Sequence, residues 1–360
     1  MTPLGLDRRD MRWEEHLDAL SPVEHTKGVF WKREDKFAPL GYGGINGSKL
    51  RQCIYMFDRY MRSGSCAAGL VSGASVKSPQ LPMGAAMAAH WKVPCALVIG
   101  ATNPVAAMKH ENVATAVAFG ARFHFIHVAY NPQLQKAVRE LGDGSCSRFY
   151  QLAYGITTPE KASDADIEAF HRIGSAQVAN TPEDVTTLYV PSGSANSTVS
   201  ILYGLARFRP RLRHVVLFGI GPNRLGWIHD RLRAIERASG VPIVHLFRRV
   251  FTSSPHLAFA QNTDAGCGEA SPYLLTHYDL HTTKFAAYQD EMPFAMADIE
   301  FHPTYEGKVL TYIHKNRETF ADFWSGRAMF WIVGSKPRLA SMARWIGEMP
   351  LPREVPRWPA

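Results

Sequence analysis

The 360-residue sequence has no apolar run approaching the roughly 18–20 residues that a membrane-spanning helix needs. Its N-terminal segment is charged and lacks the apolar stretch of a secretory signal, so we expect a cytoplasmic protein without a membrane partner. Internal repeats, low-complexity tracts and long charged linkers are also missing. With 46% hydrophobic and 20% charged residues, the composition is that of a globular protein with two or three domains or lobes.

Cysteine is scarce, and its pattern excludes two kinds of structure. The five cysteines are scattered along the chain, are odd in number and never form a CxxC pair. This argues against a disulfide framework or a structural zinc site and favours a reducing compartment. Histidines four residues apart, such as His277 and His281, come without a clustered carboxylate or thiolate, so we expect no metal site.

Positive charge is in excess, with a formal net charge of +8. Part of it is local, because ten arginines lie between Arg207 and Arg249 against only Asp230 and Glu236. One interpretation is a face that attracts phosphates, acidic metabolites or nucleic acid. The other is a solvated helical surface, and charge alone does not decide between them.

Short apolar runs alternate with longer helix-like segments, which predicts a doubly wound α/β protein with a parallel sheet covered by helices. The expected strands are 28–35, 67–73, 95–100, 123–128, 187–191, 214–220, 241–247 and 328–334. The expected helices are 49–62, 84–90, 104–119, 132–141, 164–180 and 229–239.

Three turns rich in glycine and serine interrupt this pattern, at 39–52, 71–84 and 189–200. The first and third precede helix-like runs, and such junctions present backbone N–H groups and a helix dipole to an anion. One such loop alone would be an ordinary tight turn, but three of them, one with a lysine just before a helix, favour an anion site. Neither a Walker A motif nor GxGxxG occurs, so a P-loop or a Rossmann dinucleotide site is not indicated.

The first of these turns carries a recognisable motif. Lys32-Arg-Glu-Asp35, Gly43-Gly44 and Asn46-Gly-Ser-Lys-Leu-Arg51 together resemble the KRED…GGNKxRK signature of fold-type II pyridoxal 5′-phosphate (PLP) enzymes. The nearest branch is the 1-aminocyclopropane-1-carboxylate (ACC) deaminase and D-cysteine desulfhydrase family. Its motif lysine forms the internal aldimine with PLP, which implies this role for Lys49. The sequence departs by two extra residues inside the motif, which displace Asn46 relative to the lysine.

The second turn is similar to the family's segment around its active-site serine. The resemblance places Ser78 at that serine and Gln80 at a cofactor-binding position. Pro79 replaces the asparagine that is expected to bond the phenolic oxygen of PLP. Proline has no side-chain donor, so this contact must be missing or supplied elsewhere. Ser78 also fits a helix N-cap, which leaves a purely structural role open.

The third turn, Pro191–Thr198, looks like the family's phosphate cup, although it has fewer glycines. The residues implied to wrap the phosphate of PLP are Gly193, Ser194, Ala195, Asn196 and Ser197.

Two further segments complete the resemblance, which covers about residues 28 to 338. Phe301–Lys308 is close to the family's DPxYxGK motif and implies that Tyr305 is the active-site tyrosine; Tyr278 is the candidate for a second aromatic residue. A structural role as a core tyrosine remains the alternative for Tyr305. In the last strand, Val333 stands where the family has a threonine at the pyridine nitrogen, so Ser335 or water would have to replace it.

The resemblance implies a fold like that of the tryptophan synthase β-subunit, with two open parallel-sheet domains and PLP between them. We expect residues 1–51 and 161–360 to form the large PLP-binding domain, and 52–160 the small α/β domain. Lys49 must be unprotonated to form an imine, so burial or positive neighbours should lower its pKa. It would hold the cofactor and then move the α-proton, while PLP acts as the electron sink.

The main functional hypothesis is a PLP-dependent deaminase or lyase that acts on a small amino acid through Lys49. An alternative is a PLP enzyme whose amino acid is carried on an anionic nucleotide or a DNA base, which the arginines and the changed cofactor contacts would suit. Another is a non-catalytic relative of the fold. A homodimer is compatible with the family, but the sequence shows no interface signature.

Overall fold

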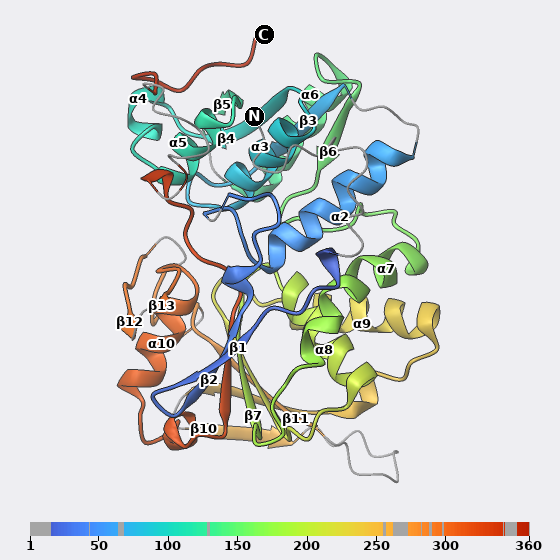
Figure 1. Ribbon diagram of the computed structural model, residues 1–360, viewed down its shortest axis with the longest axis vertical. Helices are drawn as coiled ribbons and strands as arrows, with labels where there is room; N and C mark the ends of the chain where they lie inside the picture. Colours follow the sequence, from blue (N-terminus) through green and yellow to red (C-terminus); the bar gives the residue numbers. More distant parts are fainter. Residues whose placement is uncertain are drawn as a thin grey trace. The chain divides into compact units, whose positions relative to one another are not determined.

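Figure 1 shows the computed structural model of the chain. It describes residues 16–42, 44–63, 68–127, 130–254, 257–261, 273–281, 283–287, 290–296, 299–340, 342 and 351–359, without the side chains of 248–261. Within these residues no helix is long and apolar enough to cross a membrane. No group of three or more potential metal ligands occurs in them either. Three of the cysteines are free and buried, whereas Cys66 and Cys267 lie outside the described residues.

The chain folds into two compact units. Unit 1 comprises 1–17, 38–160 and 336–360, and unit 2 comprises 18–37 and 161–335. The break at 160/161 coincides with an expected domain boundary. The units differ from the expected domains at 1–17, 38–51 and 336–360, which group with 52–160. Which domain binds PLP stays a prediction.

Unit 2 is built on an eight-stranded sheet of order β1-β2-β14-β7-β8-β11-β9-β10. In that order the strands are Val23–Thr26, Val29–Arg33, Ala328–Ile332, Thr187–Ser192, His214–Gly219, Tyr273–Asp279, Phe247–Ser254 and Leu257–Gln261. All pairs from β2 to β9 are parallel, and the edge strands β1 and β10 pair antiparallel. A parallel array brings the carboxyl ends of its strands to one edge of the sheet, where ligands bind in such folds.

Helices cover both faces of this sheet (Figure 1). On one side lie α7 (Asp164–Ser175), α8 (Asn196–Phe208) and α9 (Leu225–Ser239), and on the other lies α10 (Glu306–Lys315). The short elements of the unit are η2 (Glu34–Lys36), η3 (Ala176–Val178), η4 (Val244–Leu246), η5 (Ala321–Trp324), β12 (Ala295–Met296) and β13 (Ile299–Glu300).

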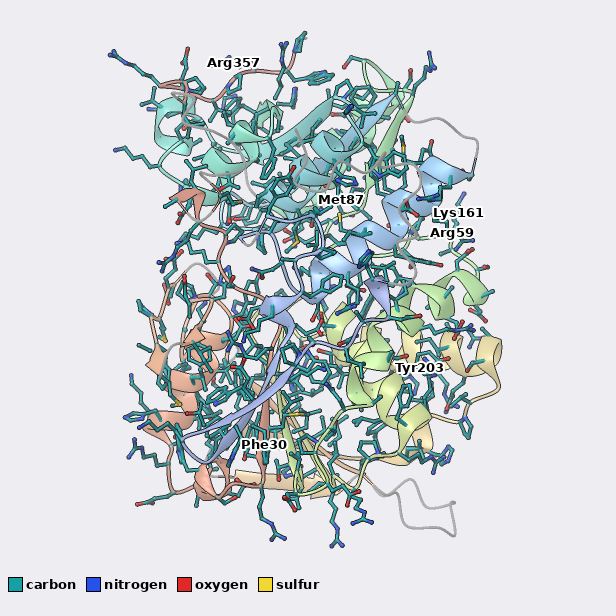
Figure 2. The ribbon with its side chains drawn as sticks, viewed as in Figure 1. Phe30, Arg59, Met87, Lys161, Tyr203 and Arg357 are labelled. Carbon is teal, nitrogen blue, oxygen red and sulfur yellow. The ribbon has the colours of Figure 1, made fainter. Side chains whose placement is uncertain are left out.

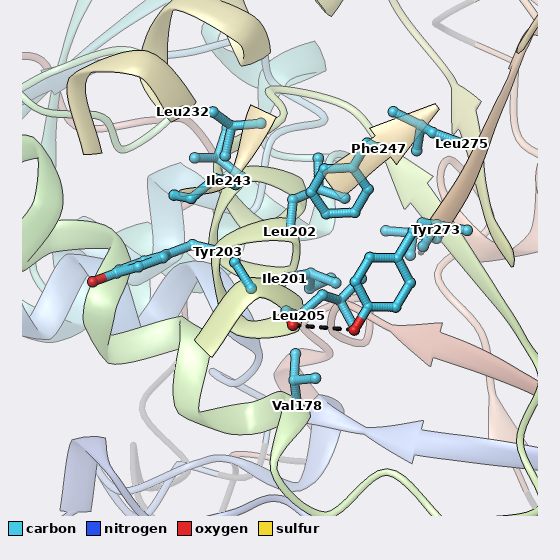
Figure 3. Packing of buried hydrophobic residues seen from close by; sticks show 14 of the residues in the cluster. Val178, Ile201, Leu202, Tyr203, Leu205, Leu232, Ile243, Phe247, Tyr273 and Leu275 are labelled. Carbon is cyan, nitrogen blue, oxygen red and sulfur yellow. Dashed lines mark hydrogen bonds between the residues drawn. The ribbon is translucent and has the colours of Figure 1, made fainter. Parts of the chain in front are cut away.

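The period-2 alternation of β7 divides its side chains between two hydrophobic cores. Leu188 and Val190 pack in the core under α8 and α9, and Tyr189 packs in the aromatic core beneath α10. Figure 3 shows the first core, in which the Tyr273 hydroxyl donates to the carbonyl oxygen of Leu205 at 3.2 Å. Tyr203 lies on α8 (Figure 2), and its hydroxyl donates a hydrogen bond to the buried Glu168 of α7. The two cores hold the sheet and its helices as one frame.

Unit 1 contains a four-stranded, fully parallel sheet of order β5-β4-β3-β6. Its strands are Arg122–Ile126, Cys95–Gly100, Gly69–Gly73 and Phe149–Leu152 in that order. Its helices are α2 (Ser48–Arg62), α3 (Gln80–His90), α4 (Pro104–Ala107), α5 (Glu111–Ala118) and α6 (Asn131–Asp143). The C-terminal segment covers the edge strand β5, because the amide of Phe123 bonds Pro356 and its carbonyl accepts from Trp358. Arg357, labelled in Figure 2, lies over the Phe125 ring.

Two parallel sheets covered by helices confirm the predicted α/β class, but several element boundaries were wrong. The expected strand 241–247 is an irregular stretch followed by the 3-10 turn η4, because the Glu236 carboxylate accepts the N–H groups of Ile243 and Val244 at 2.6 and 2.7 Å. The expected helix 104–119 is interrupted between α4 and α5. The strands that were not predicted are β1, β6, β9, β10, β11, β12 and β13.

The KRED motif proves to be a polar network inside unit 2, at the end of β2 and in η2. Lys32 is fully buried; its Nζ donates to the carbonyl oxygen of Ser21 at 2.8 Å and to Oδ1 of Asn180 at 2.7 Å. The remaining contacts are Glu34 with Ser21, and Arg33 with Asp35 and Glu24. The Lys32–Asn180 bond ties the segment 18–37 to the rest of the unit, and the other bonds stabilise the segment itself, so the motif has a structural function here.

We predict that Lys32→Met destabilises the protein by about 1–3 kcal/mol, because the Ser21 carbonyl and Oδ1 of Asn180 both lose a charged donor, and only the Ser21 carbonyl keeps a second donor, from the Asn180 amide. Lys36→Met is the matched control: Lys36 belongs to the same segment, but its side chain is 48% exposed and pairs with Glu24 at the surface. A surface pair contributes about 0–1 kcal/mol. Urea unfolding of both variants tests this, and equal losses of stability would contradict the structural role of Lys32.

Candidate functional site

The loop after β7 has the geometry of an anion site. Ala195 adopts a left-handed conformation (φ 69°) directly before α8, whose first turn contains no acidic residue. The first N–H groups of a helix have no acceptor within the helix, and a left-handed residue before them forms a concave nest of N–H donors. The Thr198 hydroxyl donates to Oγ of Ser192 at 2.9 Å and so joins this turn to the end of the strand. The predicted phosphate cup at 193–197 therefore suits a phosphate.

Tyr305 lies against this loop within unit 2. A Cβ atom placed on Gly193 would be only 3.0 Å from Cε1 of the Tyr305 ring, so glycine permits the close approach. Tyr305 is 7% exposed and immediately precedes α10. Two residues on, a Cβ on Gly307 would be 2.0 Å from the carbonyl oxygen of Met292. The spacing of the YxGK motif is thus explained by packing, and the structure brings Tyr305 to the phosphate loop.

Glu306 is a candidate that our sequence analysis missed. Its side chain is completely buried, and its Oε1 accepts the N–H of Val333 at 2.8 Å. Its Oε2 is buried and has no hydrogen-bond partner among the described residues. Burial raises the pKa of this carboxyl to about 8, and nearby Asp35 adds to the effect. An acidic residue directly after Tyr305, at the variable position of the YxGK motif, was the available signal.

Lys49 lies in the first turn of α2 in unit 1. Gly47, the residue before this helix, has φ 96°, a left-handed value that glycine tolerates and that turns the chain into the helix. The side chain of Lys49 is partly buried, and desolvation lowers the pKa of its amine to about 8. A much larger fraction of this amine is therefore unprotonated near neutral pH than for an ordinary lysine, as imine formation requires.

Ser78 and Gln80 lie at the start of α3 in unit 1. The backbone N–H of Gln80 donates to the Ser78 hydroxyl at 3.3 Å, whereas Pro79 occupies the N-cap position of α3, so the role of Ser78 stays a prediction. The Gln80 amide donates to Oγ of Ser72 at 2.9 Å and to the carbonyl oxygen of Ala153 at 3.0 Å, and it accepts the N–H of Gly155 at 2.7 Å. In this structure Gln80 therefore fixes the segment after β6, and its contact with a cofactor stays a prediction.

Tyr278 and Ser335 are less closely tied to a site. The Tyr278 ring stacks on Phe218 at 5.4 Å and lies 5.2 Å from the Phe320 ring, as part of the aromatic core beneath α10. Its neighbours therefore favour a packing role. Ser335 follows the end of β14 by three residues, and its role stays a prediction.

The arginine cluster divides between the two edges of the unit 2 sheet. Residues 207–213 begin in the last turn of α8 and continue past its C-terminal end, about 20 Å along that helix from the phosphate loop. Three arginines of the cluster pair with carboxylates: Arg211 with Glu183, Arg233 with Glu236 and Arg237 with Asp164. These features favour the solvated-surface interpretation for most of the cluster. Arg224 differs, since it follows β8 at the same edge as the phosphate loop. The side chains of Arg248 and Arg249 lie outside the described ones.

These groups match the three polar features of PLP. The loop 193–197 can hold its phosphate, the buried Glu306 carboxyl offers an oxygen to a protonated pyridine nitrogen, and the Lys49 amine can react with its aldehyde. Each unit therefore offers groups that suit PLP, and in unit 2 the Glu306 carboxyl lies beside the backbone of Val333.

Glu306 gives a prediction for the protein without cofactor. Its carboxyl holds a proton more tightly in the folded than in the unfolded state, so its contribution to stability is lost as pH rises from 4.5 to about 8. The stability of Glu306→Gln relative to the wild type should therefore improve with pH, with a limiting slope of about 1.4 kcal/mol per pH unit. Urea unfolding of both apoproteins between pH 5 and pH 8 measures this, and parallel pH profiles would contradict it.

The fold is shared with solved PLP enzymes, although no family model matches the chain. The crystal structure of an ACC deaminase homologue superposes with a TM-score of 0.63 and 16% identity, and the match covers 89% of this chain and 90% of that one. The structure of O-ureido-L-serine synthase superposes with a TM-score of 0.50 and 14% identity, over 93% and 96% of the two chains. At this level of identity the matches show the fold alone.

A closer sequence relative is the O-seryl-dTMP PLP-dependent decarboxylase of Salmonella phage ViI. It is 36% identical, and the match covers 98% of this chain and 90% of the relative. The expected cofactor is thus confirmed, and so is the fold type. With a match over almost its whole length, the chain belongs to the family of fold-type II PLP-dependent enzymes that includes this decarboxylase.

Proposed function

We propose that the protein is a PLP-dependent decarboxylase of an amino acid carried on a nucleotide. The observation that supports this is the 36% identity to the O-seryl-dTMP decarboxylase over nearly the whole chain. The name of that relative describes a seryl group joined through oxygen to deoxythymidine monophosphate. A substrate of this chemical class corresponds to the alternative that the sequence left open.

The deaminase or lyase reaction that we expected first has weaker support. The similarity to an ACC deaminase homologue is at 16% identity and concerns the fold. Fold-type II scaffolds host many reactions, so the fold does not choose the bond that breaks. Proline at position 79 and valine at position 333, both changes from the deaminase family's residues, also favour a different substrate.

In the proposed reaction the bond between Cα and the carboxylate breaks, CO2 leaves, and Cα gains a proton. When PLP is bound, it supplies an electron sink for the pair left at Cα. Lys49 is the residue that we propose to bind the aldehyde carbon, to release it to the substrate amine, and to return the proton to Cα. Its lowered pKa suits both the nucleophilic and the proton-transfer roles.

Glu306 has an electrostatic role in this proposal. Its carboxylate would hold the proton on the pyridine nitrogen, because a buried carboxylate has no solvent to share its charge with and gains most from a charged donor. A protonated ring withdraws more electron density from Cα than a neutral one. Glu306 would in this way take over the position of the hydroxyl that Val333 lacks.

The remaining residues would bind and orient. We assign the phosphate to the N–H groups of 193–197, and we place the Tyr305 ring, which packs on Gly193, beside the phosphate end. Ser78 would contact the substrate carboxylate from the turn that precedes α3. Arg224 is the arginine that we propose for the nucleotide phosphate: it is half-buried, lies at the carboxyl edge of the sheet, and forms no ion pair in the described part of the chain.

We predict that the rate at which the apoprotein captures PLP depends on the protonation of Lys49. The rate should rise about tenfold per pH unit below the pKa of about 8 and level off above it, because only the neutral amine attacks the aldehyde. Stopped-flow absorbance at several pH values measures the rate of band formation. A rate that is constant between pH 6 and pH 8 would show that another step or another group is limiting.

The function itself is tested by incubating the holoenzyme with O-seryl-dTMP and following the product by mass spectrometry. We expect a mass loss equal to CO2, with the nucleotide retained. Free serine, D-cysteine and ACC serve as controls and should react far more slowly. Release of ammonia from the small amino acids at comparable rates would instead restore the deaminase hypothesis.

Recognition of the nucleotide is tested with Arg224→Ala against Arg213→Ala. Arg213 belongs to the same cluster but directly precedes β8, at the opposite edge of the sheet. We expect Arg224→Ala to raise KM for O-seryl-dTMP by about tenfold, as for a lost charge-assisted hydrogen bond, and Arg213→Ala to leave KM unchanged. Equal effects of the two variants, or an effect that salt does not weaken, would contradict a local phosphate contact.

A further inference from the structure

The segment that follows β6 in unit 1, residues 153–158, is held at the start of α3. The amide of Gln80 donates to the carbonyl oxygen of Ala153 and accepts the N–H of Gly155, at 3.0 and 2.7 Å. Gln80 is the residue directly after Pro79. Two bonds from one fully buried side chain therefore hold this segment beside the position where the resemblance expects an asparagine.

The same segment contains a strained residue. Ile156 is completely buried and has φ 54°, a left-handed value that is unfavourable for a β-branched side chain. Such a conformation persists only when its surroundings enforce it, and strained residues gather at ligand-binding positions. The left-handed conformation of Ile156 determines the direction in which the backbone runs from Gly155 to Thr157.

Thr157 carries a hydroxyl that is shut off from solvent. Its Oγ1 is buried and has no hydrogen-bond partner among the residues that the structure describes. A buried hydroxyl without a partner is costly, and native structures explain most such groups by a ligand, an ion or a water molecule. The clamp, the strain and the hydroxyl are three separate observations on one six-residue segment.

We propose that the Thr157 hydroxyl donates a hydrogen bond to the phenolic oxygen of PLP, in place of the side chain that Pro79 lacks. Proline cannot donate from its side chain, and Gln80, which is next in sequence, uses its amide to hold the segment that carries Thr157. The inference rests on the PLP chemistry of the proposed function. It makes Thr157 a cofactor-binding residue that fixes the tilt of the ring and the acidity of the bound chromophore.

The negative charge of the phenolic oxygen determines the direction in which the midpoint of the pH titration should shift. A hydroxyl donor stabilises a negatively charged phenolic oxygen, and this makes the bound chromophore easier to deprotonate. Without the donor, the midpoint of its pH titration should move to higher pH. A residue with only a packing role would not shift this midpoint.

The experiment compares Thr157→Val and Thr157→Ser with Thr115→Val. Thr115 is the matched control, since it is also in unit 1, is fully buried on α5 and has no hydrogen-bond partner for its hydroxyl in the described residues. For each holoenzyme the absorption band is titrated with pH, and the Kd of PLP is measured with the apoprotein. The thermal stability of each apoprotein shows whether it folds.

We expect Thr157→Val to raise the titration midpoint and to weaken PLP binding by about five- to tenfold, as for one lost hydrogen bond. The apoprotein should unfold at an unchanged or higher temperature, because valine removes a buried hydroxyl without a partner. Thr157→Ser and Thr115→Val should behave like the wild type. If Thr157→Val is poorly folded, Thr157→Ala serves in its place with the same expectation.

An unchanged midpoint and Kd in a folded Thr157→Val or Thr157→Ala protein would overturn the proposal. So would an equal shift in Thr115→Val. These outcomes are separate from the decarboxylation assay on the wild-type enzyme. If O-seryl-dTMP is not decarboxylated but the midpoint still shifts, then the substrate assignment fails and the role of Thr157 stands.

Discussion

The hydrogen bond from the backbone N–H of Val333 to the Glu306 carboxyl is the contact on which the arrangement of the candidate residues in unit 2 depends. It joins the end of β14, a central strand of the sheet, to the first residue of α10, which covers the face opposite to α7, α8 and α9. The strand and the helix therefore meet at one buried oxygen atom, Oε1 of Glu306. Tyr305 precedes Glu306 and packs on Gly193, which links this junction to the phosphate loop after β7. A buried carboxyl, an aromatic ring and an array of N–H groups are thus positioned by adjoining parallel strands and the helix they support.

The elements that the sequence predicted well are those with a local physical signature. The strands 187–191 and 214–220 are continuous apolar runs, and the glycine- and serine-rich turns before α2 and α8 mark helix starts with backbone conformations that the structure reproduces at Gly47 and Ala195. The cofactor followed from motif order, which the match to the phage decarboxylase bears out. By contrast, no strand forms over most of 241–247, because the side chain of Glu236, on the preceding helix α9, accepts hydrogen bonds from its N–H groups.

The site residues show a similar limit. Whether a carboxyl such as Glu306 is exposed or buried depends on which strand end meets the helix, and no local pattern contains that information. The same holds for Gln80, whose amide bonds residues more than seventy positions away, and for Tyr278, which joins an aromatic core. For the arginine cluster, the local sequence pattern indicated a larger anion-binding surface than the structure supports. Its local density suggested one anion-binding face, but the parallel topology sends residues 207–213 to the edge of the sheet that lies opposite the loop.

The account as a whole requires that the Lys49 amine is the group that holds PLP. The most direct measurement is reduction of the holoenzyme with borohydride, followed by proteolysis and mass spectrometry of the labelled peptide. We predict a phosphopyridoxyl group on Lys49 and on no other lysine. A label on Lys32, Lys77 or Lys308, or a reduced protein without any covalent label, would contradict the assignment of this site.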